Sequence, residues 1–147
     1  EAQVPKGMPA NPVTSFVKIH TGEGGGEVII SSLSNQHIFR FDSALNKIDS
    51  VKTSGPVVNM DIQGNSFLAC DIGMLNPNNG KFGSGRFYEL AANRLTAAPI
   101  SPIPELGRPV QITRSDLNRD GKEDYLVCEF GFVKGSLSWM ENHGDKG

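Results

Sequence analysis

Short apolar runs with a two-residue alternation are spaced along much of the chain. The first part holds four of them, bounded by Gly, Asn, Asp or Ser, at residues 15–20, 27–33, 37–42 and 47–52. A period of two is that of a β-strand with one buried face, whereas an amphipathic helix repeats about every 3.6 residues. We therefore predict four consecutive strands in this part of the chain.

The longest segment that would tolerate a helix runs from Phe87 to Ala98. Its apolar residues do not keep a helical period. Elsewhere, apolar runs alternate with clusters of turn residues, and the chain contains 17 Gly and 9 Pro. This pattern predicts an all-β fold.

Two segments of the chain are similar to each other. Residues 54–73, SGPVVNMDIQGNSFLACDIG, and 107–131, GRPVQITRSDLNRDGKEDYLVCEFG, both begin with Gly near a Pro-Val pair. Both continue as a short apolar strand, turn at an Asp and close on Cys, an acidic residue, an apolar residue and Gly. The likeness extends downstream to residues 84–90 and 134–142. Repeats of a chain commonly differ in the length of a loop, as these two do at the turn.

A weaker copy, the four strands described first, precedes both. The copies recur at roughly 40 to 55 residues, the spacing of a four-stranded propeller blade. The alternative is chance similarity, but chance would have to produce both the Pro-Val start and the closing Cys, acidic, apolar and Gly residues. We divide the chain into an extension (1–14), a degenerate blade (15–53), a second blade (54–105) and a last blade (106–147).

The last copy stops after its third strand, at WMEN. Propellers close with about four to eight blades. We therefore expect about three four-stranded antiparallel blades, the last one incomplete, in a propeller that is larger than this chain. The remaining blades or strands would come from a longer protein or from other chains.

Composition narrows the class of protein. The chain has 147 residues, 37 % of them hydrophobic, which is sufficient for a packed core. The formal net charge is -2 and the 14 basic residues are scattered, so we expect no nucleic-acid partner. No apolar run approaches the ~20 residues of a membrane-spanning helix. The N-terminus lacks a signal-peptide layout, although a signal could have been removed.

The turn of the last copy carries oxygen side chains at alternate positions. It reads DLNRDGKED from Asp116 to Asp124. Ca²⁺ takes roughly six to eight oxygen ligands in a flexible geometry, and Gly121 would supply a sharp turn. An EF-hand loop would end in a bidentate Glu, but that position is Val127 and a strand follows it. The ligand set therefore ends at Asp124, and the cation would join two strands rather than two helices.

This DxNxDGxxD loop, followed by an apolar strand and Phe-Gly, resembles the FG-GAP or VCBS-type repeat of integrin-like β-propellers. The resemblance is specific over residues 109–142 and weak elsewhere. It implies Ca²⁺ as the cofactor, bound between the first and second strands of a blade. The implied ligands are Asp116, Asn118, Asp120, the carbonyl of Lys122, and Asp124.

The alternative for this loop is a surface turn without a metal, because Asp, Asn and Gly favour turns in any case. In the middle copy only Asp61 corresponds to a ligand, and the first copy offers the Gly-rich HTGEGGGE. We expect no metal in either. If the last loop binds Ca²⁺, we expect a Kd on the order of 10⁻⁵ to 10⁻³ M, as in extracellular modules.

Two pairs of residues occupy matching positions in the last two copies. Cys70 and Cys128 should lie too far apart for a disulfide, so we predict two free, buried thiols. Asp71 and Glu129 should point away from those cysteines, close to each other at strand ends. They would be solvated charges or, alternatively, part of a ligand surface.

The remaining candidates have weaker patterns. His20, His37 and His143 share no metal-ligand spacing, and we expect them on the surface or in turns. Trp139 and Phe130 should pack between blades rather than serve as sugar platforms. The chain has no GxSxG or HExxH motif, and GEGGGE lacks the GK[ST] ending of a phosphate loop.

These patterns favour a calcium-binding, non-catalytic binding or scaffold module of a secreted, cell-surface or periplasmic protein. Its ligand would be a protein or a glycan. The alternative is the propeller portion of a larger secreted enzyme, such as a polysaccharide lyase or a cofactor-dependent redox enzyme, with its catalytic residues elsewhere.

Overall fold

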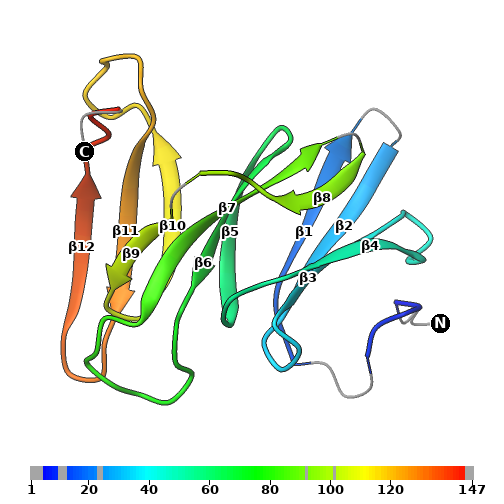
Figure 1. Cartoon of the computed structure of the whole chain (residues 1–147), viewed down its shortest axis with the longest axis horizontal. Coiled ribbons are helices and arrows are strands. Elements are labelled where there is room, and N and C mark those ends of the chain that lie inside the picture. Colours follow the sequence, from blue (N-terminus) through cyan, green and yellow to red (C-terminus); the bar gives the residue numbers. More distant parts are fainter. Residues whose placement is uncertain (1–4, 10–12, 23–24, 92, 101, 145–147) are drawn as a thin grey trace.

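The computed structural model describes residues 5–9, 13–22, 25–91, 93–100 and 102–144, and its regular elements are all β-strands (Figure 1). The prediction of an all-β fold is therefore confirmed. The strands form three antiparallel sheets of 4, 5 and 3 strands, which follow one another along the chain.

The first sheet has the order β1-β2-β3-β4 and contains β1 (Thr14–Gly22), β2 (Gly25–Ser32), β3 (His37–Phe41) and β4 (Lys47–Lys52). These are the four strands predicted from the alternation. The third sheet contains β10 (Pro109–Ser115), β11 (Asp124–Phe130) and β12 (Gly135–Met140).

The second sheet contains β5 (Val57–Gln63), β6 (Ser66–Asp71), β7 (Gly83–Ala91), β8 (Arg94–Ala97) and β9 (Ile103–Leu106). It has one strand more than a four-stranded blade. The later half of β7 pairs with β8, and the earlier half pairs with β9, at Gly83 and Gly85. One long strand thus provides an edge for two short ones.

The first strand of every sheet is irregular at the same place. The register shifts between Thr14 and Phe16, between Val57 and Asn59, and between Pro109 and Gln111. A β-bulge bends its strand and increases its twist. The three sheets therefore share this irregularity, and Phe16, Asn59 and Gln111 hold the same register position relative to it.

The sheets pack face to face. Ile29 and Ile38 of the first sheet contact Met60 and Phe67 of the second. The opposite face of the second sheet contributes Leu68, Cys70 and Phe87, which pack against Ile112 and Val127 of the third. The second sheet is thus buried on both faces, which is why β6 is apolar almost throughout.

Two buried arginines join neighbouring sheets. Arg40 of β3 donates to Asp49 at 3.0 Å and to the carbonyl of Asn93, in the β7–β8 turn, at 2.7 Å. Arg114 of β10 donates to the carboxylate of Asp61 on β5 at 3.0 Å and to the hydroxyl of Ser66 at 2.8 Å. Each guanidinium is paired and hydrogen-bonded, which buried charges require.

In the described part of the chain the three sheets form an open row, with β12 at one end and β4 near the other (Figure 1). A closed propeller is not formed. The N-terminal segment covers part of the outer face of the first sheet, because Met8 packs against the cluster that contains Phe39 and Phe41.

Candidate functional site

The loop with the predicted ligands joins β10 to β11 at one end of the third sheet (upper left in Figure 1). Two of its residues have left-handed backbone angles: Arg119 with φ 63° and Gly121 with φ 87°. Gly adopts this region without the steric penalty that a Cβ imposes. The predicted role of Gly121 in a sharp turn is confirmed.

Three of the predicted ligand side chains turn their oxygens into this loop. Asp116 Oδ1 and Asn118 Oδ1 both accept a hydrogen bond from the Asp120 N–H, at 3.1 and 3.0 Å. Asp116 Oδ2 accepts from the Gly121 N–H at 3.0 Å. Because two oxygens share one donor, Asp116 and Asn118 lie on the same side of the turn.

The side chains of Asp120 and Lys122 also meet in this loop. Asp120 Oδ1 accepts from the Lys122 N–H at 2.9 Å, while the ammonium of Lys122 lies 3.7 Å from Asp120 Oδ2. Glu141, which the sequence pattern did not identify, accepts from the side-chain amide of Asn118 at 2.8 Å. It follows β12 directly, so only the pairing of β11 with β12 brings it to the loop.

Asp124 is placed differently from the other predicted ligands. Asp124 is 0 % exposed. One carboxylate oxygen accepts from the Leu117 N–H at 3.1 Å and the other from the Asn142 N–H at 3.0 Å. These donors, that of Asn142 foremost, hold the pKa of Asp124 below its usual value. Asp124 therefore fastens the loop to the chain after β12.

The oxygen-rich loop agrees with the chemistry of a hard cation. Carboxylate and amide oxygens are the ligands that Ca²⁺ takes, and its coordination tolerates irregular geometry. Among the described residues, however, no three His, Cys, Asp or Glu side chains form a group that could hold a metal ion. The oxygens that come together here belong to Asp116, Asn118 and Asp120, and they bind backbone N–H groups.

The corresponding turns of the other sheets have other contacts. The β5–β6 turn is tight, with Gly64 at φ 55°. Asp61, which the sequence pattern matched to a ligand, holds the register position of Thr113 and is paired with Arg114. Residues 23 and 24 of the first copy lie outside the described residues.

Asp71 and Glu129 each accept a hydrogen bond from the segment just before the first strand of their own sheet. Asp71 is buried and accepts from the Ser54 hydroxyl at 3.1 Å, just before β5. Glu129 accepts from the Gly107 N–H, just before β10. The expectation of a solvated charge is wrong for Asp71, which is buried, whereas Glu129 is half-buried. Each carboxylate folds back onto the segment that precedes the first strand of its sheet.

This contact also explains why the repeat has Gly near its beginning. A Cβ at Gly55 would collide with the carboxylate of Asp71, and a Cβ at Gly107 would press on that of Glu129. Burial is the main reason that the pKa of Asp71 is raised, and the hydrogen bonds from Gly73 and Ser54 oppose it. We refer to these two contacts as the acid latches.

Both cysteines are free, as predicted, but only Cys70 is buried, whereas Cys128 is half-buried. Burial raises the pKa of the Cys70 thiol far above its usual value. Cys128 is more accessible because no further sheet of the described chain covers the third one. Trp139 and Phe130 are exposed for the same reason, so their predicted packing between blades is not found within this chain.

The prediction for His20 is wrong. It is 6 % exposed, and its Nε2 lies 2.8 Å from the carbonyl oxygen of Gly64 in the second sheet. Its ring also packs against Phe67. His37 lies half-buried next to a turn, and His143 is exposed.

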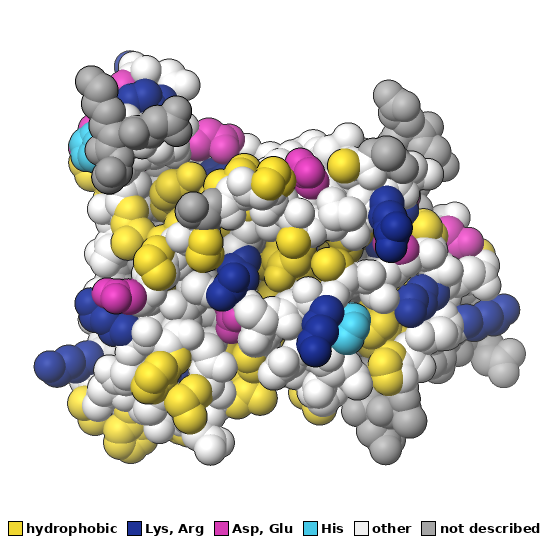
Figure 2. Space-filling model, viewed as in Figure 1, with side chains coloured by type: hydrophobic (Ala, Val, Ile, Leu, Met, Phe, Trp, Pro, Cys, Tyr) yellow, Lys and Arg dark blue, Asp and Glu magenta, His cyan; other side chains and the backbone are white. Residues whose placement is uncertain are grey.

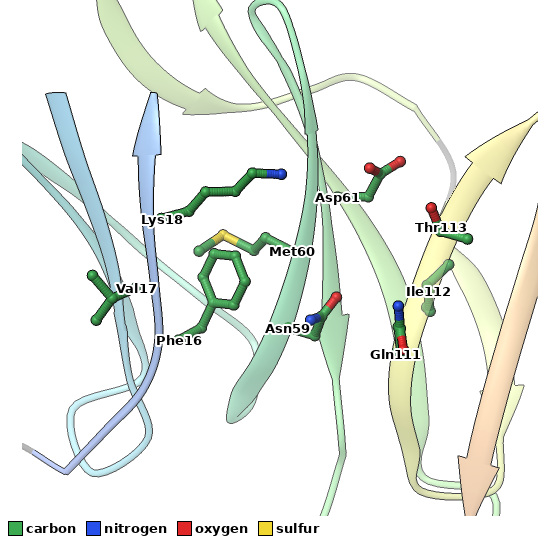
Figure 3. Close-up of a pocket in the computed structure, with 9 residues that line it drawn as sticks. All are labelled: Phe16, Val17, Lys18, Asn59, Met60, Asp61, Gln111, Ile112 and Thr113. Carbon is green, nitrogen blue, oxygen red and sulfur yellow. The ribbon is translucent and has the colours of Figure 1, made fainter. Parts of the chain in front are cut away.

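The first strands of the three sheets surround a pocket of about 350 Å³ (Figure 3). Phe16, Asn59 and Gln111 line it at one register position, and Lys18, Asp61 and Thr113 line it at the next. Asp61 is the carboxylate among these residues, and it is bound to Arg114. The pocket thus lies where the first strands of the three sheets meet, and the sequence pattern did not predict it.

Exposed apolar side chains also gather on the loops at the end of the molecule opposite the oxygen-rich loop. Hydrophobic atoms lie together there, over the β6–β7 and β11–β12 connections, at the lower left of Figure 2. The two loops touch, since the Phe132 N–H donates to the carbonyl of Asn78 at 3.1 Å. We define the loop patch as the exposed residues Met74, Leu75, Phe82, Phe132 and Val133.

No protein-family model, curated protein or solved structure matches this chain. The described residues include no helix that is long and apolar enough to cross a membrane.

Proposed function

We propose that this chain is a calcium-binding, propeller-type β module that serves as a binding or scaffold domain and is not itself catalytic. It would belong to an extracellular or periplasmic protein, where free Ca²⁺ is high enough for a weak site. The observation that carries the proposal is the inward orientation of oxygens from Asp116, Asn118 and Asp120 at the turn of one hairpin.

Calcium would replace the backbone N–H groups as the partner of these oxygens. The carbonyl of Lys122 would add a ligand. Asp124 can contribute as well, because a carboxylate has about four lone-pair sites and two are used by Leu117 and Asn142. The ion would then hold together the end of β10, the start of β11 and the segment after β12.

Thermal unfolding with Ca²⁺ or with a chelator tests this proposal. At free Ca²⁺ about tenfold above Kd, the gain in unfolding free energy is roughly 1.4 kcal/mol. For a chain of this size that corresponds to a rise in Tm of about 3–6 °C. Mg²⁺ should give a smaller rise, because it demands a nearly octahedral site.

Two variants complete the experiment. Asp120→Ala should abolish the calcium-dependent rise in Tm, whereas Glu123→Gln should keep it. The control removes one negative charge from the same loop but leaves the proposed ligands intact. Equal melting curves with calcium and chelator for the unmodified protein would refute the metal assignment.

The loop patch is the surface that we propose for a partner protein. Exposed apolar clusters rimmed by polar residues mark interaction sites, and the cores of protein interfaces are enriched in Phe and Met. A fluorescent apolar dye should bind the native protein and bind less to a Phe132→Ser, Val133→Ser double variant. Unchanged dye binding by a folded double variant would contradict the assignment.

A further inference from the structure

A second pocket lies between β4 of the first sheet and β7 of the second. Its volume is about 220 Å³. Lys52, at the end of β4, lines it from the first sheet, and Arg86 and Tyr88 of β7 line it from the second. Ser54, in the connection from β4 to β5, also lines it. Two cationic side chains and two hydroxyl groups therefore belong to the lining of one small pocket.

Contacts between the two sheets hold this pocket in place. The Leu95 N–H of β8 donates to Asp49 Oδ2 of β4 at 3.0 Å, and Asp49 also binds the buried Arg40. The Ala98 N–H, just after β8, donates to the carbonyl of Phe87 on β7 at 3.0 Å. These hydrogen bonds fasten β7 and β8 to β4, so the cationic residues of the pocket are carried by rigid strands.

Arg86 differs from the two arginines that join neighbouring sheets. Arg40 and Arg114 each donate to a carboxylate at 3.0 Å and to a backbone carbonyl. Arg86 has no hydrogen bond or ion pair with another described residue, and its Nε is buried without a partner. In native proteins, buried donors are nearly always hydrogen-bonded to the protein or to a bound molecule. Arg86 therefore has donors to offer to an acceptor in the pocket.

Asp71 is the carboxylate on which the charge of Arg86 acts, but it is not that acceptor. Burial raises the pKa of Asp71, and the positive charge of Arg86 opposes the rise. The oxygens of Asp71 accept from the Ser54 hydroxyl at 3.1 Å and from the Gly73 N–H at 2.8 Å. They form an acid latch instead of an ion pair with Arg86. Lys52 and Arg86 together thus outweigh Asp71 by one positive charge.

Tyr88 adds a polar group to the deep side of the pocket. It is 4 % exposed, and its ring belongs to the core between the first two sheets. Its hydroxyl has no hydrogen-bond partner among the described residues, although a buried tyrosine usually has one. Burial raises the pKa of Tyr88, so its hydroxyl keeps the proton and can donate it in a hydrogen bond.

The rest of the lining is mostly apolar. Ala97, Ala98, Ile100 and Pro102, from the end of β8 and the connection to β9, contribute to it. Small-molecule pockets typically combine apolar walls with a few convergent polar groups, but those for drug-sized ligands have volumes of about 300–1,000 Å³. The smaller volume of this pocket limits its occupant to a compact molecule.

We propose that this pocket binds a compact organic anion that carries a single carboxylate. The guanidinium of Arg86 would take the carboxylate through two parallel hydrogen bonds, a planar geometry that Lys cannot offer. Lys52 would add a second positive charge, and Tyr88 a further hydrogen bond. The carbon skeleton would lie along Ala98 and Ile100. The surplus of one positive charge matches a carboxylate better than a phosphate monoester, which carries about two negative charges at pH 7.

This site is distinct from those of the proposed function. The oxygen-rich loop belongs to the third sheet, and the loop patch is formed by the β6–β7 and β11–β12 connections. The pocket between β4 and β7 would add recognition of a small acid to a binding module. It contains none of the proposed calcium ligands, so it can be tested independently of the metal.

Titration of the full chain with butyrate, glucuronate and glucose provides the first test, with Ca²⁺ held constant. The first two carry one carboxylate, on an aliphatic and on a sugar skeleton, and glucose carries none. At least one acid should shift the side-chain Nε–H signal of Arg86 in ¹H–¹⁵N NMR spectra, with a Kd on the order of 1 mM for so small a ligand. Whichever acid binds more tightly identifies the skeleton that the apolar wall accepts.

Two results would overturn the proposal. One is the absence of a shift with either acid up to about 50-fold above the expected Kd. The other is binding of glucose or of inorganic phosphate as tightly as the better acid, because the site would then not recognise a single carboxylate.

Variants of Arg86 assign the site to this pocket. Arg86→Gln should weaken binding of the acid at least tenfold, since a hydrogen-bonded charge is lost. Arg86→Lys should restore only part of the affinity, because it returns the charge without the paired donors. Lys134→Gln removes one positive charge from an exposed position of the third sheet and should leave the Kd unchanged. Equal affinities of Arg86→Gln and Lys134→Gln would contradict the assignment.

Lys52→Gln keeps the test decisive if Arg86→Gln does not fold. Lys52 is exposed, so its replacement leaves the core intact, and it should weaken binding several-fold. An unchanged Kd for this folded variant would overturn the pocket as the site. A protein that binds neither acid but whose Tm still rises with Ca²⁺ would overturn this inference alone, whereas binding with equal melting curves would overturn the metal site alone.

Discussion

The hairpins β5–β6 and β10–β11 are built alike but differ in what surrounds them. Both have a bulge in the first strand, and both have an acid latch at the end of the second. The first is buried on both faces and turns tightly at Gly64. The second has one open face and a long, oxygen-rich loop. The features that they share set the geometry of the hairpin, whereas the features that differ lie where function can vary.

Breaking the buried ion pair between the hairpins should cause the largest loss of stability. Arg114→Ala would leave Asp61 without its cation between two sheets, and breaking such a pair costs about 3–5 kcal/mol. Chemical denaturation measures the loss. The double variant Arg114→Leu, Asp61→Leu should recover much of it, because apolar replacement of a buried pair is often nearly neutral. A small loss for Arg114→Ala would show that this pair does not join the sheets.

Two leucines at the same register position, Leu68 in the second sheet and Leu126 in the third, test how the difference in burial affects stability. Leu68 is 0 % exposed, so Leu68→Ala should lower the unfolding free energy by about 2–5 kcal/mol. Leu126 holds the same register position but is half-buried, and its replacement should cost less, about 1 kcal/mol. Denaturant titration at low protein concentration compares them.

Asp124 distinguishes the loop of the second hairpin by its response to pH. Its pKa is lower in the folded state than the ordinary value of 3.8. The stabilisation is therefore fully present above about pH 4 and is lost as pH falls through the lower, folded-state pKa. Asp124→Asn should reduce the Tm at pH 7 and flatten its decline in acid, measured in chelator. Glu123→Gln is the control, and an unchanged acid profile for Asp124→Asn would count against the anchoring role.

The smallest expected effect is a difference in thiol reactivity between the two cysteines. In the native protein, Cys128 should react with a thiol reagent at least tenfold faster than Cys70, because only Cys70 is buried and has a strongly raised pKa. Mass spectrometry after timed labelling identifies the modified residue. Both should react at similar rates in denaturant. Equal rates in the native protein would mean that the second sheet opens as readily as the third.

The sequence predicted the strands well, because alternation is a local property. The four strands of the first sheet and the three of the last are found near the expected residues. The alignment of the predicted repeat is displaced by one residue in the first strand. In the structure, Val57 is opposite Asp71 and Pro109 is opposite Glu129, so Val57 rather than Pro56 matches Pro109.

The misinterpreted residues are polar ones whose partners are distant in sequence. His20 reaches Gly64, 44 positions away, and Asp71 reaches Ser54, 17 positions away. Glu129 reaches Gly107, 22 positions away. A histidine or a carboxylate has the same local pattern whether it faces water or a neighbouring sheet, and so the pattern predicted a surface position.

The sequence by itself determined the strand periodicity, the turn at Gly121 and the run of oxygen side chains from Asp116 to Asp124, since each depends on residues that are close in the chain. Only the tertiary structure decided which oxygens meet, which carboxylates become latches and which apolar face is left open. Those outcomes depend on how sheets stack. Stacking buries surface from separate repeats, and no local pattern specifies which side of a sheet its neighbour will cover.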